Sequence, residues 1–96
     1  MTKGGLKMDI LRVSANSSPN SVAGAIASIV RSCGQTEVQS VGAGATNQAV
    51  KSIAVARGYL AAVGLDLVCF PEFSTVEIND EERTAMRFVC FALSEE

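Results

Sequence analysis

The sequence predicts an α+β fold, a two-layer sandwich in which two helices cover one face of a four-stranded mixed sheet. Two segments have apolar residues at helical spacing, and each follows a short strand-like run. Two further strand-like runs follow the second helix and are separated by a polar turn. The length of 96 residues suits one domain with an ordinary core. The predicted order is therefore β-α-β-α-β-β, with residues 1–7 as a flexible extension and residues 8–96 as the domain.

The first strand and helix have clear boundaries. Residues 8–14 are mostly apolar and predict a buried strand. Ser18 is suited to cap a helix and Pro19 to begin it, while Gly34 ends it at about Cys33. A single apolar stripe is expected to face inward, formed by Val22, Ala25, Ile26, Ile29, Val30 and Cys33.

The second strand and helix continue this pattern. Residues 36–41 alternate as a strand, and the helical crossover predicts that it lies parallel to the first strand. The second helix is expected at about residues 46–62. Val55 and Tyr59 then fall on its outer face, which suggests a partner interface; the alternative is that the domain itself covers them. The inward stripe of this helix is expected to contain Ala49, Val50, Ile53, Ala56, Arg57 and Leu60, with Arg57 at its edge.

The last third predicts a projecting hairpin. Residues 65–70 form a strand, and Pro71 marks a bulge or a sheet edge because it cannot donate to a ladder. Strand character resumes at residues 74–79, turns at residues 79–82 and returns along residues 83–93.

The composition argues against common enzymes and metal sites. There is no histidine, and the three cysteines do not have metal-ligand spacing. An odd number of widely spaced cysteines in apolar surroundings predicts reduced, buried thiols in a cytoplasmic protein. No apolar run is long enough to cross a membrane. We therefore expect no catalytic residues, no metal and no cofactor.

The glycine turn before the second helix could bind an anion. Gly42 and Gly44 lie between a strand and a helix start, where backbone N–H groups and the helix dipole favour phosphate. The alternative is a turn that serves packing alone. Residues 1–60 carry six basic and two acidic side chains, whereas residues 61–96 carry two basic and eight acidic ones. Any phosphate affinity must therefore come from local geometry.

Four segments resemble the stage V sporulation protein S family. They read LRVSANSSPNSVAGAIASIVR, VGAGATNQAVKSIAVARGYLA, DLVCFPEF and ERTAMRFVC, and the similarity covers about residues 8–91. Proteins of this family are small, bacterial and cytosolic, and are similar in fold to the Alba chromatin proteins. The resemblance implies an Alba-like domain with the element order given above. It also implies a dimer or higher homo-oligomer that binds DNA or RNA.

The resemblance implies nucleic-acid contacts from the first loop, the glycine turn and the hairpin. Three departures from the pattern weaken strong duplex binding. Ser17–Ser18 replace a basic pair, Ala43 and Ala45 replace arginines, and the hairpin tip is Asp80–Glu81. Weaker or single-stranded contacts remain possible through hydroxyl, amide and backbone groups. The candidate residues are Ser17, Ser18, Asn20, Gly42, Gly44, Asn47, Gln48, Lys51, Arg83 and Arg87, with Arg12 as a further cation.

Three functions are therefore considered. The leading hypothesis is a non-enzymatic nucleic-acid-binding or regulatory protein acting in sporulation and cell-division control. The second is a protein-interaction scaffold that uses Val55, Tyr59 and the hairpin. The third is a sensor of a small phosphorylated ligand at the glycine turn.

Overall fold

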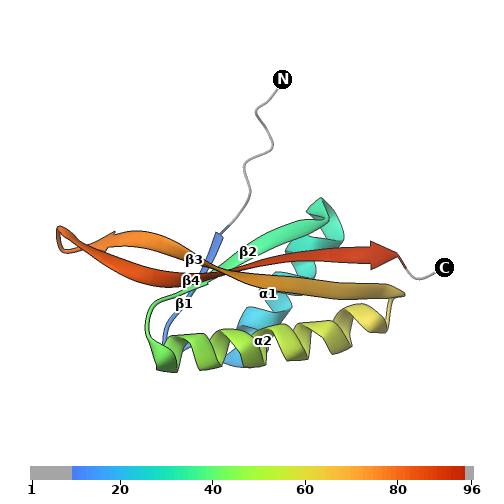
Figure 1. Ribbon diagram of the computed structural model, residues 1–96. Helices are drawn as coiled ribbons and strands as arrows, with labels where there is room; N and C mark the ends of the chain where they lie inside the picture. Colours follow the sequence, from blue (N-terminus) through green and yellow to red (C-terminus); the bar gives the residue numbers. More distant parts are fainter. Residues whose placement is uncertain (1–9, 95–96) are drawn as a thin grey trace, which may run out of the picture.

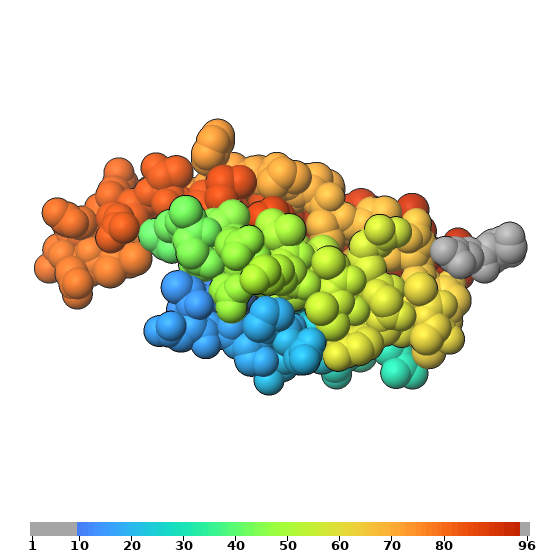
Figure 2. Space-filling model, turned by 90° about the horizontal axis from the view of Figure 1, so that it is seen from below, coloured from blue at the N-terminus to red at the C-terminus, as the bar shows by residue number. Residues whose placement is uncertain are grey.

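The computed structural model describes residues 10–94, and its elements follow the predicted order. A four-stranded mixed sheet has the strand order β1-β2-β4-β3, with β1 parallel to β2 and the other pairs antiparallel. The two helices lie side by side on one face of this sheet (Figures 1 and 2). The predicted extension at residues 1–7 lies outside the described residues. The elements are β1 (Ile10–Val13), α1 (Pro19–Cys33), β2 (Gln35–Ser40), α2 (Ala43–Ala61), β3 (Leu65–Ile78) and β4 (Glu81–Ser94).

The core lies between the sheet and the helices. Strand alternation places Val38 of β2 opposite Phe88 of β4, and both side chains are buried. Ile26 of α1 and Leu60 of α2 pack into the same cluster from the helical layer. The intervening residues of each strand point to the opposite face of the sheet. That face is mixed, because Arg87 is paired there with Glu37 and Glu72 while the apolar side chains of Phe70 and Leu93 are exposed.

Helix α1 has the predicted boundaries. Ser18 accepts a hydrogen bond from the backbone N–H of Ser21 at 3.4 Å, Pro19 begins the helix, and Gly34 ends it at φ 89°. The predicted inward stripe is partly wrong, since Cys33 is exposed. The buried face is shifted toward Ala23 and Ala27. Because alanine is only weakly hydrophobic, the sequence pattern does not predict this shift. The residues actually buried are Ala23, Ile26, Ala27 and Val30.

Helix α2 begins three residues earlier than predicted, at Ala43. Gly42 alone makes the turn, at φ 91°, and Gly44 is already inside the helix. The predicted stripe is wrong at Val50 and at Arg57, which are both exposed, and it missed Ser52, which is fully buried. The hydroxyl of Ser52 tolerates burial because it donates to the carbonyl of Gln48 at 2.7 Å. The buried face contains Ala45, Ala49, Ser52, Ala56 and Leu60.

The hairpin is longer and tighter than predicted. Strand β3 runs without interruption through Pro71, which pairs in register with Phe88. Because β3 is an edge strand, Pro71 marks the edge rather than a bulge. The turn consists of Asn79 and Asp80 alone, at φ 52° and 64°, and not of residues 79–82. Both positive angles are typical of the two-residue turn that matches strand twist.

The three cysteines differ in burial. Cys90 is buried and lies in register with the half-buried Cys69, whereas Cys33 is exposed, so the prediction of three buried thiols is wrong. A hydrogen bond with Cys90 lowers the pKa of the Cys69 thiol. The same hydrogen bond, together with burial, raises the pKa of Cys90. Within residues 10–94, neither helix is long and apolar enough to span a membrane.

Candidate nucleic-acid interface

The first loop and the start of α2 lie against each other. The side-chain amide of Gln48 donates to the carbonyl oxygen of Ser17 at 2.8 Å. A Cβ atom added to Gly44 would lie 3.2 Å from the Cβ of Ala15, so glycine allows the close approach of loop and helix. Two of the three segments predicted to contact nucleic acid therefore share one edge of the molecule.

The loop at residues 14–18 is held by its own hydroxyl groups. The Ser17 hydroxyl accepts from the backbone N–H of Ser14 at 2.9 Å, and the Ser17 N–H donates to the Ser14 carbonyl at 3.1 Å. Ser18 is occupied as the cap of α1. These serines therefore shape the loop. Asn20, in the first turn of α1, is exposed.

The start of α2 offers backbone donors. Gly42 supplies no side-chain cap, and its carbonyl accepts from the N–H of Thr46 at 3.0 Å. The N–H groups of Ala43, Gly44 and Ala45 precede the first intrahelical bond and lie at the positive end of the helix dipole. Asn47 and Lys51 are exposed one turn apart on the same helix.

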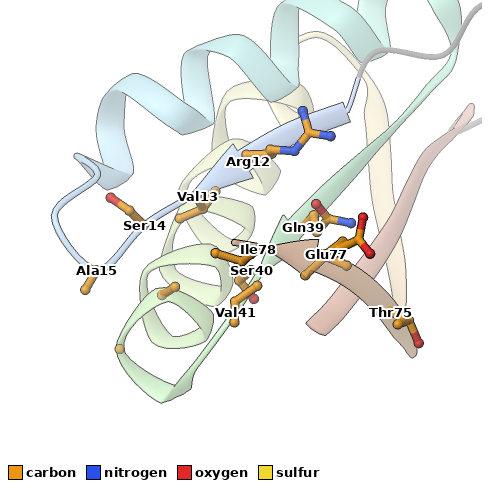
Figure 3. Close-up of a pocket in the computed structure, with 13 residues that line it drawn as sticks. Arg12, Val13, Ser14, Ala15, Gln39, Ser40, Val41, Thr75, Glu77 and Ile78 are labelled. Atoms are coloured by element: carbon orange, nitrogen blue, oxygen red, sulfur yellow. The ribbon is translucent and has the colours of Figure 1, made fainter. Parts of the chain in front are cut away.

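The hairpin contributes the third part of this edge. Residues 75–78 of β3 line a cavity of about 670 Å³ together with Arg12, Gln39, Ser40 and Gly44 (Figure 3). The cavity lies where β1 and β2 end and α2 begins. All three predicted segments reach this cavity, but of the predicted contact residues Arg12 and Gly44 alone line it. The sequence analysis did not identify Gln39, Thr75 or Glu77 as part of this site.

The basic candidates divide into two groups. Arg12, Lys51 and Arg83 are exposed, and within residues 10–94 they form no ion pair. Arg87 instead donates to Glu72 and lies 3.9 Å from Glu37. The hydrogen bond to Glu72, and then its negative charge, raise the pKa of Arg87, with a smaller contribution from Glu37.

Arg87 does not line the cavity, although the sheet register places it opposite Gln39, which does. It also pairs with Glu72 of β3, on the face away from the helices. Arg83 does not line the cavity either, but it lies opposite Val76, which does. The roles of both arginines in binding stay predictions.

The two residues predicted to form a partner surface on α2 differ in exposure. Val55 is half-buried and packs against the core, whereas Tyr59 is 47% exposed on the following turn. A partner role for either residue stays a prediction. Across residues 10–94, no group of three His, Cys, Asp or Glu side chains could hold a metal ion.

The comparison with known families agrees with this fold. A family model described as Stage V sporulation protein S matches residues 9–93. The match spans every helix and nearly every strand residue described above. The chain therefore belongs to the stage V sporulation protein S family, a family of sporulation-related small proteins.

Proposed function

We propose that this protein binds single-stranded nucleic acid without acting on it as an enzyme, and that it regulates sporulation and cell division in the cytoplasm. One observation carries the proposal: the first loop, the start of α2 and the hairpin arm meet around one cavity. Backbone donors from α2 and the guanidinium of Arg12 are available to phosphate at this edge.

The small number of unpaired basic side chains favours a weak and local contact with the nucleic acid. Three exposed basic side chains of residues 10–94 belong to the segments that meet at this edge and have no acidic partner: Arg12, Lys51 and Arg83. A protein that coats a duplex through its phosphates carries a larger basic surface. Exposed amides at Asn20 and Asn47 can add hydrogen bonds to sugar, phosphate or unpaired bases.

Oligomerisation would enlarge this surface. We propose a homodimer or higher homo-oligomer that buries the exposed apolar side chains of Tyr59 and Val63 at the end of α2. The same exposed side chains support the alternative function, a scaffold that binds another protein without nucleic acid. A pull-down that survives nuclease treatment and is lost in Tyr59→Asp would favour this scaffold.

Fluorescence anisotropy tests the binding proposal. Labelled single-stranded RNA, single-stranded DNA and duplex DNA would be titrated with the protein at 25–200 mM salt, about the range where phosphate contacts respond strongly. We expect salt-dependent binding that is strongest for single strands. Lys51→Gln should weaken binding several-fold on every sequence and lower the salt slope by about one.

The matched control is Arg31→Gln. Arg31 lies in the last turn of α1, at the opposite end of that helix from the loop, and is also exposed. Its loss removes the same charge but should leave the affinity nearly unchanged. Absence of binding at low salt, or binding that does not respond to salt, would refute the proposed function.

A further inference from the structure

The cavity between the hairpin arm and the ends of β1 and β2 has the size of a small-molecule site. Its volume of about 670 Å³ falls within the range of about 300–1,000 Å³ that is usual for such sites. Val13, Val41, Val76 and Ile78 supply apolar walls, and the first turn of α2 forms one side. An apolar slot with a few polar groups suits a flat ring that carries hydrogen-bonding atoms on its edge.

Three polar side chains in the cavity remain available to such a ring. Arg12, Gln39 and Glu77 all line it, and none makes a hydrogen bond or ion pair with another described residue. Figure 3 shows the polar ends of Gln39 and Glu77 on the same side of the cavity. The set therefore combines a carboxylate acceptor with amide and guanidinium donors.

Glu77 is the informative member of this set. Among the described lining residues it is the acidic one, on an edge that otherwise offers donors and a cation. A carboxylate there repels phosphate, so it disfavours a site for phosphate alone. It becomes favourable when a ligand presents N–H groups to its two oxygens.

We propose that this cavity binds an unpaired guanine base. Among the nucleobases, guanine presents two adjacent N–H donors, N1–H and N2–H, beside the acceptor O6. Glu77 would accept from both donors, while Gln39 or Arg12 would donate to O6. The pairing edge of the base is used, so the guanine must be single-stranded or a free nucleotide.

Both sources of guanine share this chemistry. Within a strand, the neighbouring phosphates would lie toward the N–H groups at the start of α2, where Gly44 lines the cavity. This version rests on the proposed function, because it requires the strand to bind along the same edge. A free guanine nucleotide would use the same base contacts without a strand.

A single-base series measures the preference. Ten-nucleotide uridine strands carrying one central G, A, C or U would be compared by anisotropy, with guanosine monophosphate titrated separately by calorimetry. We expect the strand with G to bind about tenfold more tightly than the others. Glu77→Gln should abolish this preference, so that the strand with G binds no more tightly than the other three.

Glu82→Gln is the matched control. Glu82 lies directly opposite Glu77 in the hairpin, is exposed and does not line the cavity. The same change of charge there should preserve the preference for G. Loss of the preference in both variants would attribute it to net charge and overturn the inference.

The remaining outcomes separate this inference from the proposed function. Salt-dependent binding with equal affinity for all four strands overturns the guanine site and leaves the proposed function standing. Binding of guanosine monophosphate that depends on Glu77, with no strand binding, supports the guanine site and refutes the proposed function. Absence of both overturns both.

Discussion

The two halves of the β3–β4 hairpin share one ladder but differ in what covers them. In the covered half, residues 65–70 and 89–94, Leu67 and Cys90 are buried against the helical layer. In the projecting half, residues 73–78 and 81–86, Phe73 is 78% exposed and the tip extends beyond the helices (Figure 1). The pairing continues without a break from one half to the other. Backbone pairing thus extends the hairpin outward from a packed base. Apart from Ala85 and Met86, which lie nearest that base, the side chains of the projecting half are exposed or half-buried.

The comparison is tested most strongly by truncating one residue in each half of β3. Leu67→Ala should lower the free energy of unfolding by about 2–5 kcal/mol, because it leaves a cavity in the core. Phe73→Ala should change it by less than about 0.5 kcal/mol, as at other exposed positions. Urea unfolding followed by circular dichroism measures both. Equal losses would mean that the projecting half is packed against something, such as a second copy of the chain.

The two ends of α2 give a second test. Gly42 begins the helix beside the cavity at φ 91°, so Gly42→Ala forces a side chain into a strained conformation and should cost about 1–2 kcal/mol. Gly58 lies in the helix with open space around it, so Gly58→Ala should gain up to about 1 kcal/mol. Thermal unfolding would show the opposite signs. A stabilising Gly42→Ala would show that the turn before α2 relaxes without strain.

The smallest effect is expected at the hairpin tip. Asp80 has φ 64°, which glycine adopts at lower cost, so Asp80→Gly should raise the free energy of unfolding by about 0.5 kcal/mol. Asp80→Ala removes the same charge without that freedom and should not stabilise the protein. If Asp80→Gly has no effect, the tip opens before the covered half unfolds, and amide hydrogen exchange would show this directly.

Local signals in the sequence predicted most of the fold. Ser18, Pro19 and Gly34 delimit α1 because caps and breakers act over a few residues. The buried face of α2 was mispredicted, since Ala and Ser dominate it and neither residue contributes a strong hydrophobic signal. Tertiary packing, and not periodicity, selected Ser52 for burial.

The sequence predicted only some of the residues of the candidate site. The glycine turn and Arg12 belong to segments with recognisable local patterns. Gln39 and Glu77 instead line one cavity because the long twisted hairpin brings its arm to the ends of β1 and β2. The residues next to Gln39 and Glu77 in the sequence do not predict that the two side chains share a cavity. Their relative position depends on the register of the β2–β4 and β3–β4 pairs.

Pro71 has a consequence for the behaviour of the protein at high concentration. It sits midway along the outermost strand β3, where a missing N–H interrupts the row of donors that another chain could pair with. A fourteen-residue edge would otherwise be a template for edge-to-edge growth into fibres. The proline thus lets the chain keep a long exposed strand while remaining protected from self-templated aggregation.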